Sequence, residues 1–348
     1  AFTLNGRKLM KRKLIPVLIL TILLSMIVMP VSAVHHEKPV VVAHIKGAVG
    51  PGTHLSAMIN NMTSYEWKII TGDLTAENLT DSNVLITCIA DAALVYSTNE
   101  LSAISSWMEA GGKTIWVTGE SDYPTDQPRI PETNAVLEVI DSKLRNEECS
   151  VEDPTSNGGA PYRVLGISTN VAPEMEFMVR GVERALFHGP GIIVGYEDGD
   201  YIDLSEESME NVYVIMTTTE NGLVVDSSEP APNVMVAGSE GEFPLMVMEI
   251  DYEKGNTIIA TGDSPYNHYT GMYMPELINE GRYGTGGNPQ QGEYLVKNIL
   301  RYGTVFGSKI LSQTSEIMTK ESEIESLSEN VESLNTEVSD LESEVSTL

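Results

Sequence analysis

Two stretches of the sequence end in the same short run of side chains that could do chemistry. The run Thr-Gly-acid-Ser-x-Tyr follows an apolar stretch in "GGKTIWVTGESDYP" (111–124) and again in "KGNTIIATGDSPYN" (254–267). A carboxylate beside a hydroxyl could serve as base and nucleophile, or the oxygens could bind a cation. The same run is also an ordinary way to end a strand, because glycine tolerates the turn and the acid and serine accept backbone N–H bonds.

The catalytic interpretation makes Ser121 the nucleophile of a hydrolase. Such a serine needs an acid and a base beside it, and the candidates are Glu120 and His268. His44 and His54 are alternative bases. His54 and His268 fall on loops that a doubly wound sheet places at its carboxyl edge, where ligands gather.

The metal interpretation uses the acids of both stretches. If the two strands lie side by side, Glu120, Asp122, Asp263 and Ser264 bring together hard oxygen ligands, which suit calcium or magnesium. Neither loop has the spacing of an EF-hand, and an acidic chain contains many accidental carboxylate clusters. No other cofactor is expected, since the glycine-rich segment 46–56 matches neither phosphate-loop signature and two cysteines cannot build a cysteine-based zinc site.

The chain of 348 residues is strongly acidic, with 50 Asp and Glu against 21 Lys and Arg and a formal net charge of −29. No basic patch of useful size follows residue 33, which argues against nucleic acid as a partner. Such acidity supports solubility, cation binding, or life in salt or at a crowded cell surface.

Residues 1–33 have the pattern of a secretory signal peptide. Five basic residues between Arg7 and Lys13 precede an apolar run that ends in Val31-Ser32-Ala33. Met10 is the expected start, which leaves 1–9 as extra upstream residues. The alternative is a retained membrane anchor, since about 18 apolar residues nearly span a bilayer. We expect an exported, extracellular protein of the cell surface.

Two further features fit export. Asn61 and Asn78 begin Asn-x-Thr sequons and are candidate glycosylation sites. Cys88 and Cys149 could form a disulfide outside the cytoplasm. The alternative is that Cys88 is a plain core residue of an apolar strand.

Apolar strands alternate with helices from residue 39 onward. The pattern predicts strands over 39–45, 66–72, 83–90 and 113–119, and helices over 53–62, 75–82, 97–112 and 132–145. This alternation is typical of a doubly wound, mostly parallel α/β sheet of the flavodoxin-like or amidotransferase-like type.

The alternation loosens between about 150 and 250. Candidate strands there are joined by Gly-, Pro- and Glu-rich connections, and cover 163–169, 191–196, 211–219 and 245–251. We interpret the region as a β-rich insertion or the irregular far side of the same domain. A strand over 256–263 and a closing helix over 290–303 complete an α/β domain of residues 34–306.

Residues 307–348 predict an α-helical coiled coil. β-branched residues recur every seven positions and leucines interleave with them: Ile317, Ile324, Val331, Val338 and Val345, then Leu327, Leu334, Leu341 and Leu348. Lys320 occupies one of the leucine positions, near the start of the repeat. This pattern favours a homo-oligomer through 310–348, with a parallel dimer preferred and a trimer as the alternative. A lone solvated helix would have no reason to keep so strict an apolar seam.

The acidic charge of this segment affects how strongly two copies would associate, and the repeat continues to Leu348. Residues 313–348 carry ten acids and one lysine, so self-association places Glu337 and Glu342 across from like charges and should tighten with salt or at low pH. The repeat is interrupted at Leu348, so we expect further sequence beyond it, and membrane anchoring there.

The stretches 83–122, 249–268 and 294–303 together resemble the class I glutamine amidotransferase-like superfamily, and are most similar to its non-catalytic, exported or membrane-linked prokaryotic members. The resemblance spans about 39–305 and implies the α/β fold. It also implies a nucleophilic cysteine after the strand 113–119 and a later His-x-Glu pair. Glu120 or Ser121 stands at the cysteine position, no second glycine follows, and His268 precedes Tyr-Thr, so the amidase triad is missing.

We therefore expect an exported, non-catalytic envelope protein that acts through protein–protein interaction. In this interpretation an α/β head on an oligomerising coiled coil takes part in a surface-layer or other envelope assembly, with other envelope proteins as partners. The alternative is a hydrolase or a metal-dependent enzyme that uses Glu120 and Ser121 together with Asp263 and Ser264.

Overall fold

The computed structural model describes residues 38–266, 272–273 and 290–346. The expected signal peptide, His268 and the terminal Leu348 lie outside these residues. Among the helices within them, none is both long enough and apolar enough to cross a bilayer.

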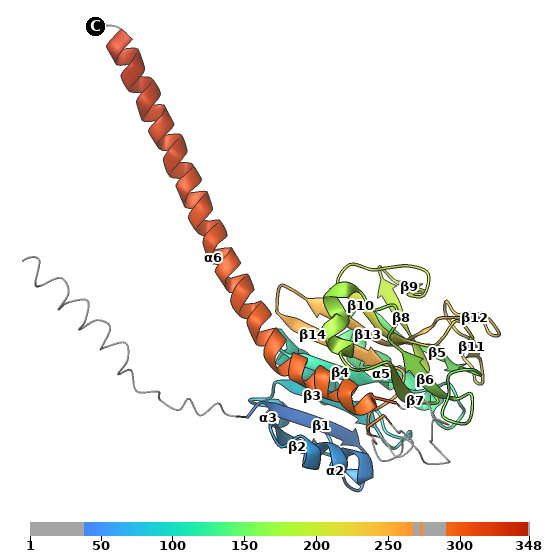
Figure 1. The fold of residues 1–348 in the computed structure, drawn as a ribbon. Coiled ribbons are helices and arrows are strands. Elements are labelled where there is room, and N and C mark those ends of the chain that lie inside the picture. The colour runs from blue at the N-terminus through green and yellow to red at the C-terminus, as the bar shows by residue number, and fades with distance from the viewer. Residues whose placement is uncertain (1–37, 267–271, 274–289, 347–348) are drawn as a thin grey trace, which may run out of the picture. The chain divides into compact units, whose positions relative to one another are not determined.

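A nine-stranded mixed sheet forms the centre of the fold (Figure 1). Its parallel half runs in the order β2 (Glu66–Ile70), β1 (Val40–Lys46), β3 (Val84–Ile89), β4 (Thr114–Thr118) and β14 (Asn256–Thr261). The other half is antiparallel and continues with β13 (Pro244–Asp251), β10 (Val212–Thr217), β6 (Arg163–Ile167) and β7 (Arg184–His188). The expected α/β character is confirmed, but the sheet is mixed rather than mostly parallel.

The region 150–250 explains the difference. Its strands β13, β10, β6 and β7 pair antiparallel, and β13 is joined to β14 by residues 252–255 alone, whereas parallel neighbours need a crossover of a dozen or more residues, usually a helix. It also contributes to a second, antiparallel sheet of β12 (Glu240–Gly241), β11 (Gly222–Val225), β5 (Leu144–Glu152), β8 (Gly191–Glu197) and β9 (Asp200–Ile202).

The helix expected over 132–145 is shorter in the structure. α5 covers Ile130–Val139, the backbone turns at Asp141 with a φ of 56°, and β5 begins at Leu144. Glu249 of β13 fixes this turn, because its Oε2 accepts hydrogen bonds from Ser142 Oγ at 2.7 Å and from Lys143 N at 2.9 Å. A contact with a distant strand therefore overrides the local helical pattern.

Helices cover both faces of the parallel half, because successive strand residues point to opposite faces. One core contains Val41, Ile86 and Trp116 with side chains from α2 (Gly52–Asn61) and the first turns of α6. The other contains Val42, Leu85 and Val117 with side chains from α3 (Ala76–Leu79), α4 (Thr98–Glu109) and α5. The short 3-10 helices are η1 (Gln127–Arg129) and η2 (Pro173–Val179).

The last helix, α6, runs without interruption from Gly292 to Ser346. Its first turns are buried, and Asn298 Nδ2 anchors it by donating to Met178 O at 3.0 Å and Arg180 O at 3.1 Å. From Ile324 onward its apolar side chains are exposed. The closing helix and the helical tail expected from the sequence are thus one helix. The coiled coil itself stays a prediction.

Candidate functional site

The two repeated stretches lie side by side. β4 and β14 are neighbouring parallel strands, and their register pairs Thr114 with Thr257 and Thr118 with Thr261, which is the alignment of the repeat itself. The two stretches are thus parallel neighbours with similar ends, as expected, although the sheet that contains them is mixed. Glu120 and Asp263 therefore follow their strands by the same number of residues at the carboxyl edge of the sheet.

The glycine of each stretch packs against the second sheet. A Cβ added to Gly262 would overlap the carbonyl oxygen of Gly191 at the start of β8, and one added to Gly119 would overlap Asn146 Oδ1 on β5. Gly191 N donates to Gly262 O at 2.9 Å, and Asn146 Nδ2 donates to Glu120 O at 3.1 Å. Gly262 thus permits the close approach of two backbones, and Gly119 leaves room for the side chain of Asn146.

The packing of the second sheet against Gly119 and Gly262 covers the carboxyl ends of β4 and β14, where the candidate residues lie. The exposed fractions of the residues expected to do chemistry are small: Glu120 9%, Ser121 4%, Asp122 0%, Asp263 0% and Ser264 1%. The next side chain, Tyr123, is 60% exposed and marks where the loop reaches the surface.

Both aspartates accept hydrogen bonds from backbone N–H groups, and each has at least one donor in a distant segment of the chain. Asp263 Oδ2 accepts from His188 N at 2.8 Å, and its Oδ1 accepts from Ser264 N at 2.7 Å. Asp122 Oδ2 accepts from Ser227 N and, at 3.1 Å, from Ser228 N. The two carboxylates thus hold the loops 188–191 and 226–228 against the sheet edge.

The expected cation site is not assembled as a ligand cluster. Within 38–266, 272–273 and 290–346, no group of three or more His, Cys, Asp or Glu side chains is arranged to hold a metal ion. One oxygen nevertheless stands out. Asp122 Oδ1 is buried, and among the described residues it accepts no hydrogen bond.

The two serines occupy equivalent turns. Ser121 Oγ accepts from Tyr123 N at 3.3 Å, and Ser264 Oγ accepts from Tyr266 N, also at 3.3 Å. Such serine turns are a common way to satisfy backbone N–H groups after a strand. Of the candidate bases, His44 lies on β1 and His54 lies in α2.

Both cysteines are free and buried, so the structure does not contain the disulfide considered from the sequence. Burial raises the pKa of Cys88 to about 12, although a hydrogen bond from Ser264 acts in the opposite direction. Burial, followed by the nearby carboxylates of Glu147 and Asp122, raises the pKa of Cys149 well above its ordinary value. Thiols held protonated in this way are poor nucleophiles.

The sequons lie on different parts of the surface. Asn61 is exposed at the end of α2. Asn78 is half-buried and completes a capping box with Thr75 at the start of α3, where its Oδ1 accepts from Thr75 N at 2.9 Å.

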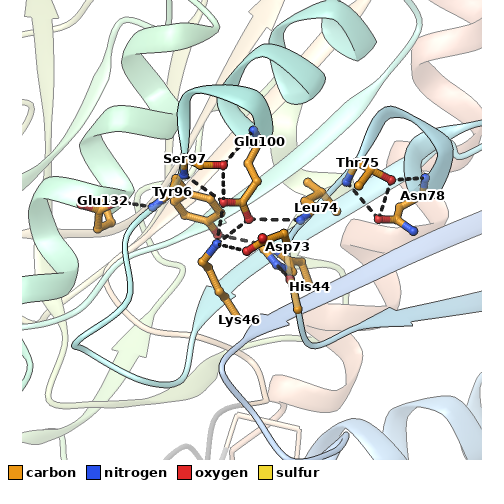
Figure 2. A network of polar contacts seen from close by, with 11 residues as sticks. His44, Lys46, Asp73, Leu74, Thr75, Asn78, Tyr96, Ser97, Glu100 and Glu132 are labelled. Carbon is orange, nitrogen blue, oxygen red and sulfur yellow. Dashed lines mark hydrogen bonds and ion pairs between the residues drawn. The ribbon is translucent and has the colours of Figure 1, made fainter.

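A polar network beside the ends of β1 and β3 was missed in the sequence (Figure 2). Lys46 Nζ, at the end of β1, lies 2.6 Å from Glu100 Oε1, 2.5 Å from Glu100 Oε2 and 3.0 Å from Asp73 Oδ1. The side chains of Lys46 and Glu100 are only 5% and 1% exposed, whereas that of Asp73 is 80% exposed. The pair is therefore a buried ion pair with one exposed neighbour.

Glu100 also satisfies backbone groups of two segments. Its carboxylate accepts from Leu74 N at 3.1 Å and from Ser97 N at 2.9 Å, and Ser97 caps the start of α4. Burial acts to raise the pKa of Glu100, but the hydrogen bonds from Lys46, Ser97 and Leu74 outweigh it, so its pKa lies below the ordinary value. The Ser-x-x-Glu capping box of 97–100 was visible in the sequence, but its lysine partner was not.

His44 belongs to the same network. Its Nε2 lies 2.9 Å from Gly72 O, and its Nδ1 lies 3.4 Å from the hydroxyl of Tyr96. Burial lowers the pKa of His44, against the opposing effect of the Gly72 hydrogen bond. The two ring nitrogens of His44 thus lie against Gly72 O and the Tyr96 hydroxyl. Within the described part of the chain, neither contact involves Ser121.

A cavity of about 370 Å³ lies next to this edge, at the ends of β1 and β3 and beside the first turn of α2. It is lined mainly by apolar and glycine-rich surface, including Ile45, Ala90, Tyr266, His54 and the segment 50–53. The hydroxyl of Tyr266 is directed at backbone carbonyls and lies 3.1 Å from Ile86 O. The glycine-rich segment 46–56 of the sequence thus lines part of this cavity.

No protein-family model and no curated protein sequence matches the chain. Among solved structures, the mmIFT52 N-terminal domain is similar, with a TM-score of 0.51, 11% identity, and coverage of 76% of this chain and 97% of that one. A candidate component of GMP synthase from Thermoplasma acidophilum gives a TM-score of 0.34 and 12% identity over 82% of this chain and 100% of that one. At this identity, the first likeness shows a shared fold alone.

Proposed function

We propose that the chain is an exported, non-catalytic protein of the cell envelope that works through protein–protein interaction. Its α/β head, residues 34–306, belongs to the amidotransferase-like group, and its helix 307–348 brings copies together. Export rests on the signal-like pattern of residues 1–33 and on the acidic composition. The expected association with surface-layer or other envelope proteins is part of the same proposal.

The closed carboxyl edge of β4 and β14 carries the non-catalytic part of this proposal. An active site needs access for substrate, and Ser121, Asp122 and Asp263 are 4%, 0% and 0% exposed. Asp122 and Asp263 already accept backbone hydrogen bonds that hold neighbouring loops. This structural role explains why these two positions hold an aspartate, and it requires no catalytic reaction.

An activity-based probe tests the absence of catalysis. A fluorophosphonate reacts covalently with serines that a neighbouring base activates, and we expect no labelling of the native chain. Labelling that disappears in Ser121→Ala, while that variant keeps the unfolding temperature of the native chain, would contradict the proposal.

One observation favours a second candidate function, the binding of a divalent cation. Asp122 Oδ1 is a buried acceptor that accepts no hydrogen bond within the described part of the chain, and Glu148 lies close enough for the two charges to interact. Burial, with the charges of Glu147 and Asp122, raises the pKa of Glu148 despite the hydrogen bond from Gln127. A cation at this position would relieve the repulsion among these acids.

Thermal unfolding with and without calcium or magnesium separates the two functions. The interaction proposal predicts no increase in the unfolding temperature of the native chain beyond that seen in Asp122→Asn. The cation alternative predicts an increase of several degrees that Asp122→Asn abolishes, because a ligand bound to the folded state alone stabilises it. An equal increase in both proteins reflects screening of the acidic surface, and would speak against this site.

A further inference from the structure

The exposed side of α6 presents a continuous apolar seam. Seven side chains at a and d positions are each more than half exposed: Ile324 62%, Leu327 62%, Val331 55%, Leu334 59%, Val338 52%, Leu341 54% and Val345 70%. The seam runs along one helix for roughly 33 Å, at 1.5 Å per residue from Ile324 to Val345. Monomeric proteins rarely expose so long an apolar strip.

We propose that the occupant of this seam is a second copy of the same chain, bound parallel and in register. The inference rests on the proposed function, in which α6 brings copies together, and adds the partner's orientation and register. β-branched residues at a and leucine at d form the packing pattern that favours two parallel strands. In register, each of these residues meets its own counterpart, so the seam is complementary to itself.

The charges of α6 fit a second acidic copy better than its composition suggests. Between Ile324 and Leu341, the four positions that flank the seam are Ser328, Asn330, Asn335 and Glu337, of which one is an acid. The outward positions of the same segment carry four acids: Glu325, Glu329, Glu332 and Asp340. Between Leu341 and Val345 the flanking positions hold Glu342 and Glu344, so like charges beside the seam are concentrated at this end of the helix, and the segment from Ile324 to Asn335 has none.

The parallel, in-register arrangement also gives specific flanking contacts. In a parallel coiled coil a g position lies beside the e position of the following heptad on the other chain. Glu323 then meets Ser328 of the second copy, and Asn330 meets Asn335, a pair whose side chains can hydrogen-bond. Glu337 meets Glu342, the one like-charged pair among these three, which makes the association sensitive to salt.

Disulfide trapping in the full chain tests the orientation and the register. Leu327→Cys and Leu341→Cys are prepared separately, with the outward position Thr336→Cys as the matched control and mild oxidation as the reaction. The native Cys88 and Cys149 are buried and provide little background. In a parallel, in-register pair both d-position variants form covalent dimers to a large extent, because each cysteine faces itself, and the control does so at least several-fold less.

The alternatives give different results. An antiparallel pair can bring at most one of the two d positions opposite itself, so trapping at only one of them, or at neither, in a chain that is dimeric by mass would overturn the orientation while leaving self-association intact. Equal trapping in the outward control would overturn the assignment of the seam. A chain that is monomeric by mass and untrapped would overturn the proposed self-association as well.

Discussion

Thr118 and Thr261 lie directly opposite each other at the carboxyl ends of β4 and β14, and each hydroxyl bonds to a residue of the neighbouring strand. Thr118 Oγ1 donates to Thr87 O at 2.5 Å, whereas Thr261 Oγ1 accepts from Trp116 Nε1 at 2.8 Å and donates to Asp263 O at 2.8 Å. Both threonines are buried. The sequence repeat thus marks two neighbouring strands that end alike and support the second sheet.

Replacing Gly262 should destabilise the head. The new methyl group of Gly262→Ala would overlap the backbone of Gly191, which cannot move without separating the two sheets. Overpacking of this kind costs about 1–3 kcal/mol. Urea unfolding followed by circular dichroism measures it. Gly72→Ala is the control, because no atom lies within 4 Å of the added Cβ there. Equal stability of the two variants would contradict the assigned contact.

Breaking the buried ion pair should cost more than breaking an exposed one. Lys46→Met leaves the Glu100 carboxylate buried without its cation, a loss of about 3–5 kcal/mol in the free energy of unfolding. Glu100→Gln added to Lys46→Met should recover part of the loss, because the unpaired charge is then removed. Lys254→Met breaks the exposed pair with Glu109 and should cost less than about 1 kcal/mol. Denaturant titration of the four proteins gives the comparison, and similar losses for Lys46→Met and Lys254→Met would refute it.

His44 should make the head less stable in mild acid. Burial lowers its pKa in the folded chain below the ordinary value of 6.5, so the unfolded chain binds a proton there more readily. Stability therefore rises with pH in the window between the lowered pKa and about 6.5, and is lost as pH falls through it. The urea midpoint should decrease from pH 7.5 to pH 5.5, and His44→Gln should reduce that decrease. An unchanged pH dependence in His44→Gln would show that other groups cause it.

Reversing one flanking charge should tighten the association of α6. Glu337→Lys replaces the like-charged contact with Glu342 of the second copy by two attractive ones, and we expect at least several-fold tighter self-association at low salt, an effect that weakens as salt rises. Glu332→Lys makes the same change of charge at an outward position and serves as the control. Sedimentation velocity over a concentration series measures both variants, and an equal gain for the two would attribute the effect to net charge alone.

The strands and helices with simple apolar patterns were predictable from the sequence. α4 was expected over 97–112 and covers Thr98–Glu109, and the parallel strands agree with their expected bounds within about two residues at either end. The regularity of β1, β3, β4 and β14 has a physical cause, since these four strands are buried along their whole length, and β2 at the edge of the sheet is partly exposed.

β5 was not predictable, because it buries polar residues. Its sequence "LRNEECSVE" gives no apolar alternation, yet Asn146 and Glu147 are 0% exposed. Glu147 is buried because its carboxylate accepts hydrogen bonds from Asn233 N and Val234 N, both at 2.9 Å. These partners are more than 80 residues away in the chain, and Lys46 is 54 residues from Glu100, so neither contact leaves a local signal in the sequence.

The candidate site was predicted in its position and not in its role. The sequence placed Glu120, Ser121 and Asp263 at one sheet edge, and the structure brings their strands together there. What the sequence could not indicate is that β8 crosses this edge, since Gly191 is far from both stretches in the chain. The repeated glycines were the available signal, because glycine commonly marks a close approach of backbones.

The mass of the full chain in solution tests the central claim most directly. Sedimentation equilibrium at physiological salt should give twice the mass of one chain, and Leu334→Lys should give a single chain whose head unfolds at the native temperature, while the outward control Thr336→Lys should remain dimeric. A native chain that sediments as a monomer would contradict the claim that α6 joins two copies.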